Sequence, residues 1–272
     1  MGYVSNSENA HLKFGLIYHS AIEAYDHARI KGSTHADATI AAVRHALTQT
    51  WDETLQRPWQ SEHNIKTRET LIRTIVWYLD QFADDPCRTI TLANGKPAVE
   101  LSFRFELGLN SRLTNEPYIL CGHLDRVVEF QGATWVTDKK TSKSTLSESY
   151  FANYTPDNQV SLYSLAGILI FNQPISGVII DAAQVAVTFS RFQRALIQRT
   201  RSQLDEWKDD LIYTIQQMEY YAKNNYWPQN DSACGLYGGC PYRGICSISP
   251  ELREKHLEAM FSKRIWDPLQ TR

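Results

Sequence analysis

The sequence has no excess of charge of either sign, no long apolar run and few cysteines. Its 272 residues carry 28 Lys and Arg against 30 Asp and Glu, a formal net charge of −2. This balance excludes an overall basic coat for nucleic acid, but not a local basic groove. No apolar run reaches the roughly 18 residues that a membrane span needs, and residues 1–10 lack the apolar stretch of a signal peptide. We therefore expect a cytoplasmic protein without a membrane partner.

The sequence also lacks internal repeats, low-complexity tracts and long linkers rich in proline or glycine. We expect a single domain over residues 1–272, with a helical N-terminal part at 12–83, a core at 89–226 and a cysteine-bearing tail at 227–272. Because a chain of this length can bury a sizeable core without disulfides, its five cysteines are interpreted as thiols or metal ligands.

Hydrophobic periodicity predicts helices in the N-terminal part. Apolar residues recur at helical spacing along one stripe, and the segments 12–30 and 36–53 are also predicted to be helical. The stripe consists of Leu71, Ile72, Ile75, Val76, Leu79 and Phe82.

After the helical part, apolar residues recur at every second position. Alternation over 99–107 predicts a strand with one buried face, and strands are also expected at 118–129, 134–139 and 177–189. Further helices are predicted at 157–171, 201–226 and 250–261. The order of these elements predicts a mixed α/β fold with a central sheet flanked by helices.

Two carboxylates and a lysine fall at the ends of adjacent predicted strands. Asp125 follows Gly-His-Leu, and Asp138 and Lys140 occur in Val-Thr-Asp-Lys-Lys-Thr. Across a hairpin such carboxylates approach to about 5 Å, where they repel unless a cation lies between them. A divalent cation such as Mg²⁺ suits these oxygen ligands, and the Lys139 carbonyl can add another. Lys140, on the face of Asp138, can orient or activate a metal-bound water. Alternatively, Asp125 pairs with Arg126 or a lysine and Asp138–Lys140 is a solvated strand end.

Two weaker patterns accompany these residues. Gln159 and Tyr163 are four apart in a predicted helix, so they share one face and can grip a DNA backbone or an unpaired base. Gly15-x-x-x-His19 lies in the first predicted helix, where a lone histidine is more often structural than a ligand.

In this order, the four motifs resemble the PD-(D/E)XK nuclease superfamily, specifically its RecB-like exonuclease branch, from Gly15 to Cys246. His19 resembles the metal-binding histidine, Asp125 the first catalytic aspartate, Asp138 and Lys140 the Asp-x-Lys pair, and Gln159 and Tyr163 the Gln-x-x-x-Tyr motif. The resemblance implies a restriction-endonuclease-like fold and hydrolysis of DNA phosphodiesters with Mg²⁺ or Mn²⁺. Relatives act in recombination, repair, CRISPR spacer capture and phage DNA metabolism, which places the protein in a bacterium or an infected host cell.

Glu100 is a further candidate ligand, because some members of the superfamily carry an acid upstream of the first aspartate. An exposed strand glutamate is the alternative interpretation.

The tail contains Cys234, Cys240 and Cys246 among glycines, which indicates soft-metal ligation. Similar tails in RecB-like nucleases join one upstream cysteine around a [4Fe–4S] cluster. Here no cysteine precedes Gly15, and Cys87 is the remote candidate. The fourth ligand can be Cys87 or another residue type, zinc can replace the cluster, or no metal binds there.

Aromatic residues are interleaved with basic ones after the Asp-x-Lys pair, a pattern that suits a single-stranded or frayed DNA end. The basic residues from 191 to 201 alternatively solvate a turn between a strand and a helix. The leading prediction is a metal-dependent DNA exonuclease. A DNA-binding or scaffold module of the same fold and a structure-specific endonuclease are the alternatives, and no protein partner is indicated.

Overall fold

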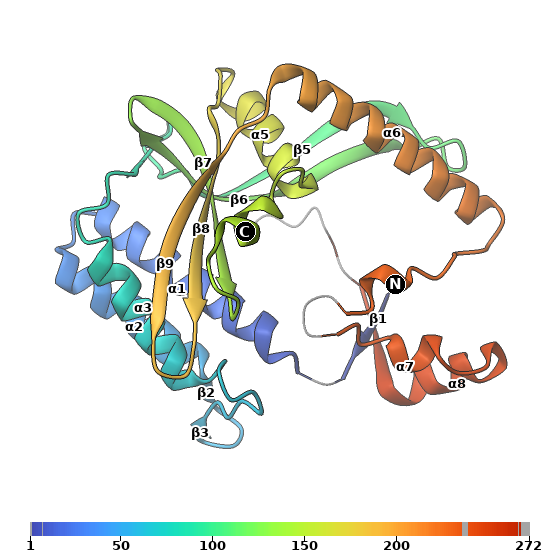
Figure 1. Cartoon of the computed structure of the whole chain (residues 1–272), viewed down its shortest axis with the longest axis horizontal. Helices are drawn as coiled ribbons and strands as arrows, with labels where there is room; N and C mark the ends of the chain where they lie inside the picture. The colour runs from blue at the N-terminus through green and yellow to red at the C-terminus, as the bar shows by residue number, and fades with distance from the viewer. Residues whose placement is uncertain (1, 7, 236–238, 266, 268–272) are drawn as a thin grey trace.

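The computed structural model describes residues 2–6, 8–235, 239–265 and 267 (Figure 1). Three helices form the N-terminal part: α1 (Ala10–Ile30), α2 (His35–Gln49) and α3 (Arg68–Gln81). Each begins at a side-chain cap, supplied by Asn9, Thr34 and Thr67, whose oxygens accept hydrogen bonds from the first free backbone N–H groups. These helices confirm the predicted apolar periodicity.

The expectation that 36–53 is one helix was wrong at its end. The helix stops at Gln49, and a two-stranded hairpin of β2 (Trp51–Asp52) and β3 (Arg57–Pro58) follows. Thr50 is the C-cap, and its hydroxyl donates to the carbonyl of Ala46 at 2.6 Å and accepts from Arg68 at 2.9 Å. These contacts tie the chain to the start of α3 instead of continuing the helix.

A six-stranded mixed sheet forms the centre of the molecule. Its strands include β4 (Arg88–Thr89), β5 (Val99–Asn110), β6 (Pro117–Phe130) and β7 (Ala133–Ser142), and the last three form the expected antiparallel meander. With β8 (Gly177–Val185) and β9 (Ser190–Ile197), the strand order is β4-β6-β7-β8-β9, and β5 pairs with another stretch of β6. Gln131 and Gly132, both with positive φ, form the tight turn between β6 and β7.

β8 (Gly177–Val185) runs parallel to β7, so the chain must cross over between them. The crossover contains α4 (Glu148–Ala152) and α5 (Asn158–Phe171). The expected strand at 177–189 was too long: β8 ends at Val185, and the chain returns as β9 (Ser190–Ile197), antiparallel to β8. The basic residues of 191–197 thus belong to a strand rather than to a solvated turn.

The two largest apolar clusters of the described residues lie on opposite faces of the sheet. α1, α2 and α3 cover one face, where Tyr18, Leu71 and Ile75 pack near Ala183 and Val185. α5 covers the other face, around Val136, Val160 and Ile180. Since side chains alternate along a strand, even-numbered residues of β7 and β8 face α5 and odd-numbered ones face α1–α3. Asp138 and Lys140 therefore face α5.

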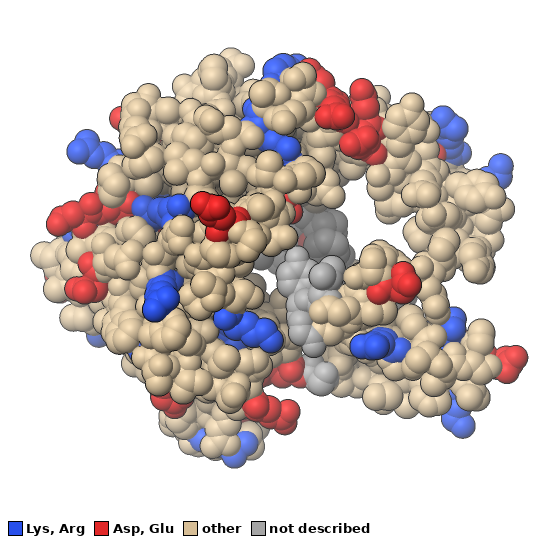
Figure 2. Space-filling view, viewed as in Figure 1, with Lys and Arg blue, Asp and Glu red and all other residues tan. Residues whose placement is uncertain are grey.

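The C-terminal part extends away from the sheet and returns to the N-terminus. α6 (Arg201–Lys223) leads to η1 (Asp231–Ala233), α7 (Arg243–Cys246), α8 (Pro250–Met260) and β10 (Phe261–Arg264). β10 pairs antiparallel with β1 (Gly2–Ser5), which the sequence did not predict. An opening remains between α6 and this returning segment, and cations and carboxylates are scattered over the visible face without one sign prevailing (Figure 2).

No helix of the described residues has the length and apolar character required to cross a bilayer.

Candidate active site

Acidic residues from three neighbouring strands come together where the β6–β7 ladder ends. By the register of the flanking pairs, Glu100 on β5 falls opposite Asp125 on β6. The β6–β7 ladder ends at the pair Arg126↔Thr137, and Asp125 and Asp138 occupy the next positions beyond it, one on each strand. Glu100 has φ 48°, in the left-handed region that non-glycine residues seldom adopt and that is found disproportionately at functional sites.

The carboxylate of Asp125 is held by an imidazole and a backbone amide. His19 Nδ1 lies 3.3 Å from Asp125 Oδ2, and the backbone N–H of Lys139 donates to the same oxygen at 2.9 Å. Burial acts to raise the pKa of Asp125, but the hydrogen bond and charge of His19, with the contribution of Lys139, outweigh it and lower that pKa to about 2. Asp125 is therefore ionised at neutral pH, as a metal ligand must be.

A chain of polar contacts leads from Asp138 into α5. Lys140 Nζ lies 2.7 Å from Asp138 Oδ2 and donates to Gln159 Oε1 at 2.6 Å. Gln159 Nε2 in turn donates to Tyr163 Oη at 2.9 Å. The spacing of four residues in α5 puts Gln159 and Tyr163 on one face, as the sequence predicted, and that face lies against Lys140.

The pKa of Asp138, which pairs with Lys140, shifts in the opposite direction from that of Asp125. Burial, opposed by Lys140 and reinforced by Asp125, raises the pKa of Asp138 to about 6. Burial acts against the charge of Lys140, but the charge and hydrogen bond of Asp138 outweigh it and raise the pKa of Lys140. Lys140 is therefore protonated at neutral pH, and its amino group contacts Asp138 and donates to Gln159.

Two tyrosines, Tyr150 and Tyr154, form a pair in the crossover between β7 and β8. Tyr150 Oη and Tyr154 Oη lie 3.2 Å apart. Burial, the hydrogen bond to Tyr150 and the negative charge of Asp138 raise the pKa of Tyr154, which places its ring within reach of that charge. Tyr154, one of the aromatic residues that follow the Asp-x-Lys pair in sequence, is thus within electrostatic reach of Asp138.

The donor set suits a hard divalent cation in kind. Asp125 and Asp138 supply carboxylate oxygens, and His19 supplies an imidazole. Asp125 raises the pKa of Asp138, so the two carboxylates repel each other, and a cation between them would relieve that repulsion. The carboxylates are engaged by His19 and Lys140, and within the described residues no group of three or more His, Cys, Asp or Glu is arranged to hold a metal ion.

The structure does not bring the four cysteines proposed for a cluster together. Cys87 is buried near Val128 and Trp135, and its Sγ accepts a hydrogen bond from Arg194 at 3.4 Å. Burial raises the pKa of the Cys87 thiol to about 11. In the tail the backbone N–H of Cys240 donates to the carbonyl of Cys234 at 3.0 Å. No metal-binding group is found across the described parts of the chain.

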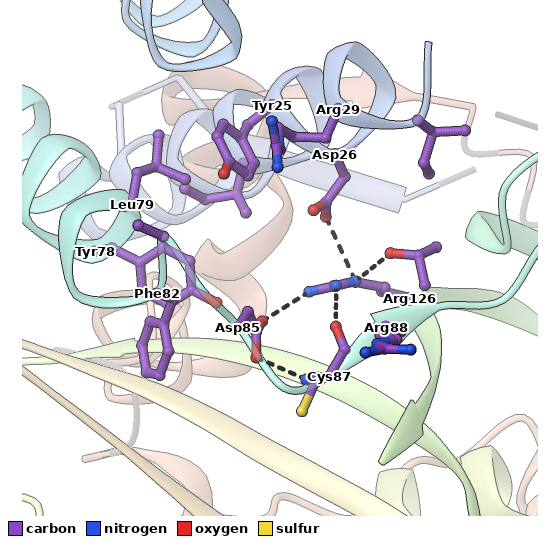
Figure 3. A pocket seen from close by; sticks show the side chains of 14 residues that line it. Tyr25, Asp26, Arg29, Tyr78, Leu79, Phe82, Asp85, Cys87, Arg88 and Arg126 are labelled. Carbon is purple, nitrogen blue, oxygen red and sulfur yellow. Dashed lines mark hydrogen bonds and ion pairs between the residues drawn. The ribbon is translucent and has the colours of Figure 1, made fainter. Parts of the chain in front are cut away.

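Sequence reasoning missed a buried polar cluster on the α1–α3 side of the sheet (Figure 3). Arg126 donates to Thr89 at 2.8 Å, to the Cys87 carbonyl at 2.6 Å and to Asp85 at 3.3 Å, and its Nε lies 3.9 Å from Asp26. These groups line a cavity of about 240 Å³. No local pattern could reveal the cluster, because its members come from separate elements. It fixes the strand residue next to Asp125.

These features, a curled mixed sheet flanked by helices with two strand-end aspartates and a lysine, define a nuclease fold. The model of the PD-(D/E)XK nuclease superfamily matches residues 2–247, and the chain belongs to this superfamily.

Two solved structures are similar to the chain. A candidate exonuclease from Eubacterium rectale is 11% identical, with a TM-score of 0.42 over 85% of this chain and 74% of that one. The protein SSO0001 is 13% identical, with a TM-score of 0.30 over 54% of this chain and 60% of that one. No curated protein sequence matches the chain.

Proposed function

We propose that the protein is a DNA exonuclease that requires Mg²⁺ or Mn²⁺ and acts on single-stranded or frayed ends. The observation that carries the proposal is the unbroken set of contacts from Asp138 through Lys140 and Gln159 to Tyr163, beside the His19–Asp125 pair. Membership of the nuclease superfamily supports hydrolysis of a nucleic acid. The alternative interpretation, in which Asp138 and Lys140 belong to a solvated strand end, does not suit Asp138, because its side chain is only 3% exposed.

In this proposal His19, Asp125, Asp138 and the Lys139 carbonyl would hold the metal, with Glu100 as an outer ligand. The bound ion would lower the pKa of water and neutralise charge on the phosphoryl group. His19 and the Lys139 amide keep Asp125 ionised and oriented. The left-handed backbone at Glu100 sets the direction of that side chain.

Lys140 supplies the fixed positive charge of the site. Hydrolysis adds water across a P–O bond, and negative charge grows on the phosphoryl oxygens during the attack. The protonated amine of Lys140, fixed by Asp138 and Gln159, donates a hydrogen bond to that charge or to the attacking water. Gln159 and Tyr163 hold Lys140 and position the DNA backbone.

The preference for single-stranded or frayed ends rests on the aromatic residues beside the site. Bases stack on aromatic rings without regard to sequence. Tyr150 and Tyr154, joined by their hydroxyl groups, offer such rings close to Asp138. A net charge of −2 disfavours strong binding of duplex DNA at high salt.

The test is cleavage of end-labelled linear DNA, single- and double-stranded, with Mg²⁺, Mn²⁺ or EDTA, alongside closed circular DNA and RNA of the same sequence. We expect stepwise shortening of linear DNA in the presence of either metal, and no cleavage by the Asp138→Asn variant. Cutting of circles would instead establish an endonuclease. Absence of cutting by the parent, with retained DNA binding, would establish the scaffold module and reject the proposal.

Recombination, repair and phage DNA metabolism stay the predicted settings. An iron–sulfur cluster or a zinc ion at the cysteines also stays a prediction. Iron and zinc analysis of the purified protein would test it directly.

A further inference from the structure

A group of four basic residues lies at the N-terminal end of α1, outside the acidic cluster. We call it the α1 basic cluster: His11, His63, Lys66 and Lys143. The rings of His11 and His63 meet edge to face, with centroids 4.5 Å apart. Burial lowers the pKa of His11, and His63, Lys66 and Lys143 lower it further. Burial lowers the pKa of His63, again with Lys143 and Lys66 adding. Lys66 and Lys143 are therefore close enough to both imidazole rings for their charges to act on them.

Lys66 is the least ordinary member of the cluster. The residue is 1% exposed, and its Nζ has no hydrogen-bond partner among the described residues. It lies over the ring of Phe14 at 4.2 Å from the centroid, one turn of α1 from His11. A buried amino group without a partner is costly, and burial lowers the pKa of Lys66 to about 7. An anion bound at this point would supply the missing acceptor and favour the charged form.

The hydrogen bonds of the His63 ring leave its Nε2 as a hydrogen-bond donor. Its Nδ1 accepts the backbone N–H groups of Ile65 and Lys66, each at 3.1 Å. In the neutral ring the proton must then be on Nε2, which becomes the donor. The nearby carboxylate of Glu8 is already engaged, because Lys13 Nζ lies 2.6 Å from one of its oxygens and Trp59 Nε1 donates to the other at 2.7 Å.

Two members of the cluster adjoin elements of the candidate active site: His11 lies in α1, and Lys143 directly follows β7. His11 precedes His19 by eight residues of α1, which is about 12 Å along the helix axis. Gly15, halfway between them, faces β7, since a Cβ added there would lie 3.8 Å from Thr141 Oγ1. Lys143 follows the end of β7 and Lys140 precedes it. A strand of nucleic acid that reaches Lys140 therefore meets the cluster a few nucleotides away.

We propose that the α1 basic cluster is a phosphate-binding subsite, which holds a phosphate group of the substrate strand away from the scissile bond. The three donors of Lys66 and the Nε2–H of His63 match the acceptor oxygens of a phosphate. The inference rests on the proposed function and deepens it. The phosphate is either an internal one of the DNA backbone or a terminal one, whose second charge would neutralise more of the cluster.

The experiment measures binding of a fluorescent single-stranded oligonucleotide to the full chain in EDTA, so that no cleavage occurs. The oligonucleotide is used with a 5′-phosphate, with a 3′-phosphate and without either, at several salt concentrations. The variants are Lys66→Met, which keeps the apolar stem, and Lys143→Met at an exposed position. Lys96→Met, in the exposed turn before β5, removes the same charge elsewhere and serves as the control.

We expect Lys66→Met and Lys143→Met to weaken binding about tenfold and to reduce the slope of log affinity against log salt by about 0.7, with Lys96→Met unchanged. Loss confined to a phosphorylated end identifies a terminal phosphate, whereas equal loss for all three oligonucleotides identifies the backbone. Parent-like affinity and slope in both variants would overturn the subsite, as would a parent chain that binds no DNA. Cleavage is assayed separately, so a nuclease with normal Lys66→Met binding keeps the proposed function and rejects only the subsite.

Discussion

Lys140 Nζ lies 2.7 Å from Oδ2 of Asp138, two residues earlier on the same strand. Extended geometry puts both side chains on one face of β7, and the buried carboxylate makes the pair short and charge-assisted. Gln159 continues the contact into α5. The lysine is thus fixed at both of its polar contacts before any substrate arrives.

Replacing Lys140 by Met should reduce metal-dependent cleavage by about 10²- to 10³-fold, the usual effect of removing one fixed donor from a site of developing charge. Single-turnover rates on labelled DNA measure the effect. Lys96→Met is the matched control and should retain the parent rate. A Lys140→Met rate within tenfold of the parent would contradict the role assigned to this side chain.

Asp138→Asn should raise stability at neutral pH in EDTA. Burial raises the folded-state pKa of Asp138 to about 6 from its ordinary 3.8, so protonation stabilises the fold at low pH, and this contribution is lost as the pH rises through 6. At pH 7.5 the neutral amide should therefore increase the free energy of unfolding by about 1–3 kcal/mol. Urea unfolding at pH 7.5 and pH 5 checks this, because the advantage of the variant should shrink at pH 5. An equal advantage at both values would refute it.

Glu100→Gly should preserve or slightly raise stability while lowering activity. The residue has φ 48°, which glycine adopts without steric cost. The relief of about 1–2 kcal/mol of backbone strain is partly offset by the roughly 0.4–1 kcal/mol that the freer unfolded chain of a glycine variant costs. The carboxylate beside Asp125 is lost at the same time, so that metal affinity should fall. Thermal unfolding and the metal dependence of cleavage are measured together. A variant that melts lower and cuts normally would show that Glu100 is structural.

Arg126→Met should destabilise the fold by about 3–5 kcal/mol, because it leaves the buried carboxylates of Asp85 and Asp26 with one cation fewer. Chemical denaturation of the variant provides the number. Arg88→Met, at an exposed position of neighbouring β4, is the matched control and should change stability by less than about 0.5 kcal/mol. Similar losses in both variants would argue against the buried cluster as their cause.

Gly177→Ala should cost at least about 1 kcal/mol of stability. Gly177 starts β8 with φ 148°, and a Cβ there would collide with the backbone carbonyl of Ile197 on β9. Gly244→Ala in α7, where an added Cβ meets nothing within 4 Å, should be neutral or mildly stabilising. The melting temperatures of the two variants test this prediction. A Gly177→Ala variant with the melting temperature of the parent would mean that β9 shifts without cost to make room for the added Cβ.

Periodicity and motif order predicted the parts of the structure that depend on neighbours in sequence. The alternation of 99–107 required one buried face, and the β5–β6–β7 meander followed from short turns such as Gln131-Gly132. The spacing of Gln159 and Tyr163 predicted a shared helical face, and the structure adds that this face meets Lys140. The chemical roles of these residues stay predictions.

The missed features depend on partners remote in sequence. The sequence leaves two interpretations of the basic residues from 191 to 201, contact with a DNA end or a solvated turn. The structure shows instead that Arg194 is largely buried and pairs with Asp85 at 2.6 Å and Asp181 at 3.0 Å. Nothing near Arg194 in sequence indicates either carboxylate. Lys66 is similar, because a lysine in a polar loop gives no sign that its amino group will lie under Phe14.

The pairing of β1 with β10 has a kinetic consequence. Four residue pairs join segments about 260 positions apart in the sequence. Closing so large a loop costs more conformational entropy than closing any hairpin of the central sheet, and only a short ladder offsets this cost. These two strands should therefore form last during refolding and open first in the native protein. Their amide hydrogens should exchange with solvent far faster than those of β8, so the arc made by α6 and the tail can open while the sheet and its carboxylates stay intact.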